Sequence, residues 1–305
     1  MSMAQDLSSK TIRLMVGVPP GGSNDFAARL ISPHLAEALG ATVIVENKVG
    51  AAGTIATDFV AKSAPDGTTL YFGGTGPILI APQAMPKVPF NFLTDIMPIN
   101  MVGETPLALA VFPGLGVKTL QEFIALSRTR PLSLASTGTG SLPHLVIESL
   151  IQASGGNILH VPYKGGGPAL ADAMGGHVSG VVQDVPTFIP LHEQGKLTLL
   201  AVTSAKRVEF LPNIPTVSET LPNFFSASST LGVYAPAKTP RAIIDKINAA
   251  LVKTVARDDV QERMRKSAIV PGATASPEAF QKLTALEYQR WGKLLREKGI
   301  VISAT

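Results

Sequence analysis

Paired prolines and paired glycines separate an apolar run from a helical pattern in Val16-Gly17-Val18-Pro19-Pro20-Gly21-Gly22-Ser23-Asn24-Asp25. Residues 11–18 are mostly apolar and predict a buried strand. After the stretch, apolar side chains recur at helical spacing as far as Gly40, a residue suited to end a helix. The sequence therefore predicts a strand, a glycine-rich turn and a helix.

Such a turn has two interpretations. Glycines keep bulky side chains away from a ligand, and the first N–H groups of a helix lack partners, so they attract carboxylates and phosphates. The same glycines also supply the backbone angles that any tight strand–helix connection needs. Ser23, Asn24 or Asp25 can cap the helix in either case.

Composition excludes several classes of protein and site. The chain has 305 residues, of which 45% are hydrophobic and 16% charged, which predicts a globular protein large enough for two lobes. It contains no cysteine, so disulfides, zinc–thiolate sites and cysteine nucleophiles are excluded. The five histidines show no metal-ligand spacing, and we expect neither a metal nor a cofactor.

The net charge of +4 is spread along the chain, and only 6% of the residues are aromatic, which disfavours nucleic-acid binding. A mildly basic protein suits a small anionic ligand. No apolar run is long enough to cross a membrane, and residues 1–10 do not resemble a signal peptide.

The strand–turn–helix pattern continues along the chain. The next predicted elements are a strand, a helix and a strand at 41–46, 54–64 and 68–72. This β-α-β-α-β order predicts a mostly parallel sheet with helices on its faces. Two apolar runs, 99–102 and 107–112, are separated by Pro106 and mark a boundary between lobes.

Glycine-rich turns also follow other predicted strands, at 73–76, 138–140 and 165–167. In open α/β sheets, ligands bind beyond the carboxyl ends of the strands, where such turns gather. Charge-assisted hydrogen bonds contribute roughly 1.5–3 kcal/mol each. Two such turns from opposite lobes could therefore hold a small dicarboxylate without an arginine.

Signatures of nucleotide binding and of serine hydrolases are absent, because the glycine spacings fit neither G-x-G-x-x-G, nor Walker A, nor G-x-S-x-G. Ser141 and His144 could act as nucleophile and base, or as the N-cap and a surface residue in the first turn of a helix. Asp25 and Asp184 could form a carboxylate pair, or each could cap a turn.

Several motifs together resemble those of the Bug, or tripartite tricarboxylate transporter receptor, family of periplasmic solute-binding proteins. The resemblance runs nearly from end to end. It rests on Pro19–Asp25 with Ala28-Arg29, Glu46–Gly53, Asp66–Leu70, Gly138–His144, Val161–Gly165, Leu211–Thr216 with Glu219, and Ala235–Pro240.

The resemblance implies an α/β clamshell of the type II periplasmic-binding-protein kind, in which each lobe is a mostly parallel sheet flanked by helices. Residues 1–102 and 229–305 would form lobe 1, residues 103–228 would form lobe 2, and the ligand cleft would lie between them. In this family, backbone N–H groups and ordered waters hold most of the ligand carboxylate.

Carried over by position, the resemblance also implies a set of ligand-binding residues. They are Val18, Pro20, Gly21, Gly22, Ser23, Asp25, Gly74, Thr75, Gly76, Thr137, Gly138, Thr139, Gly140, Ser141, His144 and Asp184. Three places depart from the pattern: Val18 stands where the family often has an aromatic residue, Gln183 stands where Phe is common, and Ser229–Gly232 lacks a Trp often found there. The identity of the ligand therefore cannot be copied from a relative.

We expect a monomeric, non-enzymatic receptor that captures a small carboxylate or dicarboxylate for the membrane subunits of a tripartite tricarboxylate-type transporter. We expect it to act in the periplasm after removal of a leader. One alternative is a ligand receptor for a membrane sensor kinase, and another is an α/β enzyme that uses Ser141, His144 and Asp184 on a carboxylate substrate.

Overall fold

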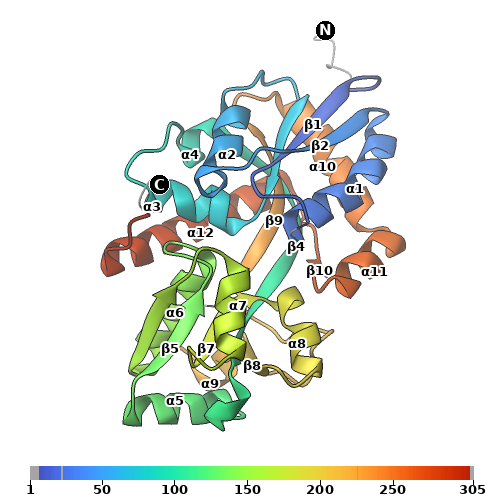
Figure 1. The fold of residues 1–305 in the computed structure, drawn as a ribbon. Helices are drawn as coiled ribbons and strands as arrows, with labels where there is room; N and C mark the ends of the chain where they lie inside the picture. Colours follow the sequence, from blue (N-terminus) through green and yellow to red (C-terminus); the bar gives the residue numbers. More distant parts are fainter. Residues whose placement is uncertain (1–6, 22, 225, 303–305) are drawn as a thin grey trace. The chain divides into compact units, whose positions relative to one another are not determined.

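The computed structural model describes residues 7–21, 23–224 and 226–302 and has the predicted α/β fold (Figure 1). The chain divides into two compact units. Unit 1 comprises Met1–Glu104, Thr230–Lys293 and Ile302–Thr305, and unit 2 comprises Thr105–Ser229 and Leu294–Val301. Within the described residues, no helix combines the length and the apolar character that crossing a membrane requires.

Most elements belong to a single unit. Those of unit 1 are β1 (Thr11–Val16), α1 (Ser23–Leu39), β2 (Thr42–Asn47), α2 (Thr54–Ala61), β3 (Thr69–Gly73), α3 (Ala81–Ala84), α4 (Phe92–Asp95), α10 (Arg241–Val255), α11 (Asp258–Lys266) and β10 (Val270–Pro271). Those of unit 2 are α5 (Leu120–Thr129), β5 (Leu132–Ser136), α6 (Leu142–Ser154), β6 (Ile158–Pro162), α7 (Gly166–Met174), β7 (Gly180–Asp184), α8 (Ile189–Glu193), β8 (Thr198–Val202) and α9 (Val217–Thr220). Residues of both units make up β4 (Ile96–Val111), β9 (Ser228–Pro236) and α12 (Pro277–Lys298).

Each unit contains a mixed sheet whose parallel part matches the prediction. In unit 1, β1 pairs in parallel with β2 and β3, and β9 pairs antiparallel with β3. In unit 2, β5 pairs in parallel with β6 and β7, while β4 runs antiparallel to β7 and β8. The carboxyl ends of β1 and β3 therefore lie at one edge of their sheet, and those of β5, β6 and β7 at one edge of theirs.

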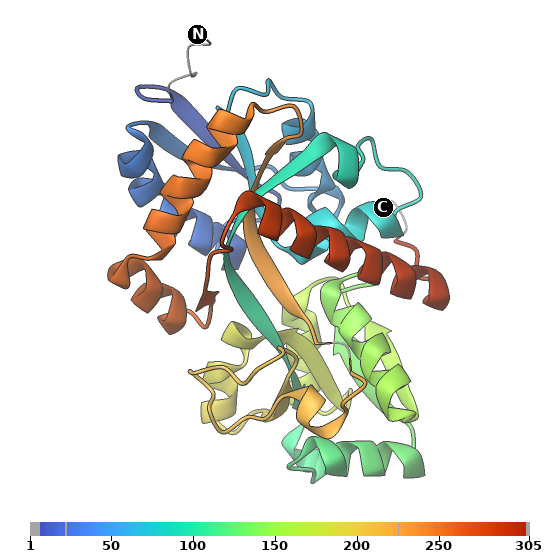
Figure 2. The same ribbon diagram turned by 180° about the vertical axis from the view of Figure 1, so that it is seen from behind.

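The main core of unit 1 lies on one face of its sheet. Leu70 and Phe72 of β3 are fully buried in this core, whereas Tyr71 between them packs against the Tyr234 ring, with 6.0 Å between the ring centroids. This alternation follows from the two-residue period of a strand. Helices α1 and α10 cover the core side by side, and Figure 2 shows them as neighbouring blue and orange ribbons.

Strand β4 contains the first apolar run and all of the second except Phe112, with Pro106 between them. Gly103 and Glu104 pair with β10, and pairing with β7 and β8 begins at Leu107 and Ala108. Proline has no N–H group, so it is tolerated where a strand changes partners. The strand therefore continues through Pro106, at the point where the chain passes from unit 1 to unit 2.

Two isoleucines on adjacent strands test this description of the core. Ile12 of β1 is fully buried, whereas Ile44 of β2 is 45% exposed. We expect Ile12→Ala to lower the free energy of unfolding by about 2–5 kcal/mol, because it leaves a cavity. The matched change Ile44→Ala should cost less than about 1 kcal/mol. Urea denaturation of both variants measures the difference, and equal losses would contradict the assigned burial.

Candidate functional site

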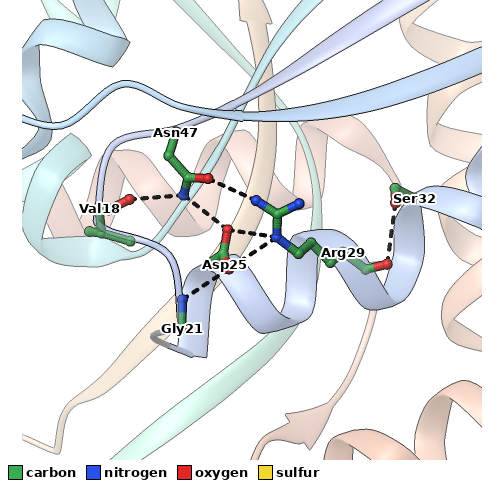
Figure 3. A network of polar contacts seen from close by, with 6 residues as sticks. All are labelled: Val18, Gly21, Asp25, Arg29, Ser32 and Asn47. Atoms are coloured by element: carbon green, nitrogen blue, oxygen red, sulfur yellow. Dashed lines mark hydrogen bonds and ion pairs between the residues drawn. The ribbon is translucent and has the colours of Figure 1, made fainter.

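The turn after β1 is organised by the carboxylate of Asp25, which is 4% exposed (Figure 3). Its Oδ2 atom accepts a hydrogen bond from the Gly21 amide at 3.0 Å, and Arg29 Nε lies 3.0 Å from Oδ1 and 3.1 Å from Oδ2. Asn47, at the end of β2, donates through Nδ2 both to Asp25 Oδ1 at 2.9 Å and to the Val18 carbonyl at 3.0 Å. Its Oδ1 accepts from Arg29 Nη2 at 2.9 Å. This network fixes the path of the turn.

Burial by itself would raise the pKa of Asp25, but the hydrogen bonds from Arg29, Gly21 and Asn47, together with the charge of Arg29, hold this pKa below its ordinary value. The carboxylate also lies in the first turn of α1, where the helix dipole favours negative charge. Asp25 is therefore an internal anion of the protein that stabilises the turn.

This arrangement corrects the expectation that the Gly21 amide can bind a ligand. The amide is not free, because Asp25 already accepts its hydrogen bond. Gly21 itself has φ +93°, which favours glycine, and Gly22 lies outside the described residues. Helix α1 begins at Ser23, and the N–H groups of its first turn have no acceptor within the helix.

Two other candidate residues of this turn are placed differently. Pro20 is exposed, and Val18 packs against the core of unit 1.

The segment Gly74-Thr75-Gly76 follows β3 and lies at the same edge of the sheet as the first turn, because β1 and β3 are parallel neighbours. Thr75 is fully buried, and its Oγ1 accepts a hydrogen bond from the Thr230 amide at 3.0 Å. The Thr75 side chain thus holds the segment that follows β3 against β9. A π-helical turn begins at Gly76 and extends to Ile80.

In unit 2, the turn after β5 is held mostly by its own residues. The Gly138 amide donates to Ser136 Oγ at 3.2 Å, and the Gly140 amide donates to His144 Nδ1 at 2.9 Å. The expectation that these two glycine amides are free donors is therefore wrong. Among the described residues, no acceptor is found for the amides of Thr137 and Thr139, which leaves these two N–H groups as the donors of the turn.

Ser141 is the N-cap of α6. Its Oγ accepts from the His144 amide at 3.3 Å and donates to the Gly138 carbonyl at 2.7 Å. The His144 ring instead accepts from Gly140 through Nδ1, and its Nε2 lies 3.8 Å from Glu148 Oε1. The structure supports the interpretation of Ser141 as an N-cap. His144 lies in the first turn of α6, but it is 6% exposed, so the expectation that it lies on the surface is wrong. Within the described residues, Ser141 Oγ and the His144 ring do not form the nucleophile–base hydrogen bond of a hydrolase.

Asp184 ends β7, beside β5 at the same edge of the unit 2 sheet. Its carboxylate is half-buried and receives no hydrogen bond from any described residue, and burial raises its pKa to about 6. Gln183 is buried and donates through Nε2 to the Gly166 carbonyl at 2.9 Å, so its side chain fastens β7 to α7. Asp25 and Asp184 belong to different units, and Asp25 is fully engaged within its own turn.

The candidate residues therefore form two sets. One set follows β1 and β3 in unit 1, and the other follows β5 and β7 in unit 2. Among the described residues, no group of three or more histidine, aspartate or glutamate side chains could hold a metal ion. Sequence reasoning missed the positioning roles of Arg29 and Asn47, although both lie in motifs that carry the family resemblance, and it gave no signal for His160.

The Asp25 network predicts a pH-dependent contribution to stability. We expect Asp25→Ala to lower the free energy of unfolding by about 1.5–3 kcal/mol at pH 7, because charged hydrogen bonds are lost. Since the native pKa is lowered, this contribution is complete above the ordinary value of 3.8 and is lost as pH falls through the native pKa. Denaturation of wild type and variant at pH 7 and pH 3 measures it.

Asp245→Ala is the matched control, because Asp245 forms an exposed ion pair with Arg241. Such a pair contributes about 0–1 kcal/mol. A loss for Asp25→Ala as small as that of the control would contradict the assigned network.

Comparison with known proteins places this geometry in a family. Residues 27–300 match the model described as the tripartite tricarboxylate transporter family receptor, TctC. The chain is 35% identical to the protein BugT of Bordetella pertussis over 299 residues, which is 97% of this chain and 91% of BugT.

Solved structures agree with this match. An R. palustris protein solved with adipate is 31% identical with a TM-score of 0.83, covering 96% of this chain and 98% of that one. MatC from Rhodopseudomonas palustris, with bound malate, is 29% identical with a TM-score of 0.78 and coverages of 94% and 99%. The periplasmic binding protein BugD is 31% identical with a TM-score of 0.79 and coverages of 96% and 98%. The predicted periplasmic-binding-protein fold is thereby confirmed, and the chain belongs to the tripartite tricarboxylate transporter receptor, or Bug, family of solute-binding proteins.

Proposed function

We propose that the protein is a periplasmic receptor that captures a small carboxylate or dicarboxylate and delivers it to the membrane subunits of a tripartite tricarboxylate-type transporter. The observation that carries this proposal is the pair of helix-starting turns, one in each unit, in a chain of this family. Relatives of similar sequence were solved with adipate and with malate, which supports a carboxylate ligand.

In this proposal, N–H groups of the two units act on the same solute. The first turn of α1 supplies them in unit 1, and the Thr137 and Thr139 amides supply them in unit 2. Backbone donors that are already oriented bind an anion without the entropy cost of ordering long cationic side chains. The solute therefore stabilises the conformation in which both turns contact it.

In this proposal, Asp184 determines which acids the protein binds. A carboxylate without an internal donor would repel an anion, unless Asp184 is protonated or the solute offers a hydroxyl, an amine or a protonated acid group nearby. The proposed ligand is thus an acid whose far end carries a hydrogen-bond donor, or a dicarboxylate that binds together with a proton.

A thermal-shift screen tests the proposed function. We expect adipate, malate or another small carboxylate to raise the melting temperature by several degrees at a concentration of about 100 times its Kd. The uncharged diamide of each positive acid is the matched control and should have no effect. A chain that responds to no organic anion would contradict the proposal, and conversion of a bound acid to product in an NMR time course would favour an enzyme.

The role of Asp184 predicts how binding depends on pH. With a native pKa of about 6, Asp184 is mostly charged at pH 7.5 and mostly protonated at pH 5.5. We expect the affinity of the wild-type protein for a dicarboxylate to be roughly tenfold higher at pH 5.5 than at pH 7.5. Asp184→Asn should bind equally well at both, as measured by calorimetry.

Glu193→Gln removes the same charge from an exposed position of unit 2 and should keep the wild-type dependence. If wild type and Asp184→Asn show the same pH profile, Asp184 does not contact the solute.

A further inference from the structure

Two stacked imidazoles lie beneath the turn of unit 2. His144 comes from the first turn of α6 and His160 from β6, and their rings lie 3.8 Å apart between centroids with an interplanar angle of 10°. His144 is 6% exposed, and His160 is half-buried.

Each imidazole is linked to one glycine amide of the turn. His144 accepts directly from Gly140 through Nδ1 at 2.9 Å. His160 Nε2 lies 2.7 Å from Ser136 Oγ, which in turn accepts from the Gly138 amide at 3.2 Å. Gly138 has φ +143° and Gly140 has φ +72°, so both glycines are held in conformations that other residues rarely adopt.

The bond from Gly140 requires a neutral His144. An imidazole nitrogen accepts a hydrogen bond only without its proton, so the proton of His144 resides on Nε2, which faces Glu148 Oε1 at 3.8 Å. Glu148 Oε2 is in turn 3.1 Å from Lys298 Nζ. Among the described residues, the charged group beside the pair is therefore the Glu148 carboxylate of α6, and the Lys298 ammonium of α12 pairs with that carboxylate.

Burial lowers the pKa of His144 to about 4. Burial and, to a smaller extent, the neighbouring His144 also lower the pKa of His160 to about 4, while Glu148 opposes the shift. Both rings are therefore neutral at pH 7. Below the ordinary pKa of 6.5, protons favour any state in which the rings are released, so the formed turn loses stability as the pH falls toward 4. A proton on Nδ1 of His144 would also place a donor against the Gly140 N–H group.

We propose that His144 and His160 are positioning residues for the turn 137–141, and that the turn keeps its binding shape only while His144 is neutral, so that acid opens the turn and releases the ligand. The claim that the histidines hold the turn concerns the turn alone, whereas the claim that acid releases the ligand rests on the proposed function. The two histidines would thus make ligand binding by unit 2 sensitive to pH, although the N–H groups that contact the ligand belong to the turn and not to the histidines.

NMR of the full chain without ligand tests the positioning role. Long-range ¹H–¹⁵N spectra should show His144 with its proton on Nε2, and the Gly138 and Gly140 amide signals should shift together with protonation of the pair as the pH falls from 7.5 to 4. His144→Phe keeps an aromatic ring but removes the acceptor, and we expect hydrogen exchange of the Gly140 amide to become about five- to tenfold faster. His144→Asn places an acceptor oxygen near the position of Nδ1 and should restore slow exchange without titrating.

Binding measurements test the claim that acid releases the ligand. With adipate as the probe, and with Asp184→Asn present in every variant so that Asp184 adds no pH dependence of its own, His144→Phe should weaken binding by about tenfold at pH 7.5, whereas His144→Asn should bind nearly as well as the parent chain and lose less affinity at pH 4.5. His177→Asn, at an exposed position of the same unit, is the matched control and should leave the pH profile unchanged.

The outcomes separate the two proposals. If adipate and other carboxylates fail to bind wild type while the glycine amides follow the histidines, the proposed function fails and the positioning role stands. If Gly140 exchanges equally fast in wild type and His144→Phe, or if its signal does not follow protonation of the pair in wild type, the positioning role is overturned whether or not a carboxylate binds.

Discussion

The parallel pairing of strands is the constraint on which the candidate site depends. Because β1 runs parallel to β3 and β5 runs parallel to β7, the loops that follow these strands meet at one edge of each sheet. Turns that are far apart in the sequence thereby become neighbours within their unit. The antiparallel strands β4 and β9 carry the chain from one unit to the other and leave this arrangement intact.

Within each turn, the protein fills some of the donor positions with its own groups. Asp25 accepts from Gly21 in unit 1, and His144 accepts from Gly140 in unit 2. These bonds shape both turns before any ligand arrives, which reduces the ordering that binding requires. The N–H groups left over at Thr137, at Thr139 and at the start of α1 are fewer than the glycines suggest, but their directions are fixed.

The same residue types would serve an enzyme in another arrangement. Ser141, His144 and Asp184 could form a catalytic set if the serine hydroxyl contacted the imidazole, but that hydroxyl caps α6 and the imidazole holds a glycine amide. The Asp184 carboxylate receives no hydrogen bond from the part of the chain that the structure describes and has a raised pKa, which suits a group that meets a solute. The chemistry of these side chains thus follows from their hydrogen-bond partners.

The sequence by itself determined the α/β class, the order of strands and helices in the first part of unit 1, and the family, because hydrophobic periodicity and glycine positions are local signals. It placed β1 and α1 to within a few residues, and it gave N-cap as one of two roles for Ser141. Only the tertiary structure decided which amides of the turns are already engaged and that His160 stacks on His144. Those facts depend on contacts between residues distant in the sequence, such as Asn47 with Asp25 and His160 with Ser136, which no local pattern encodes.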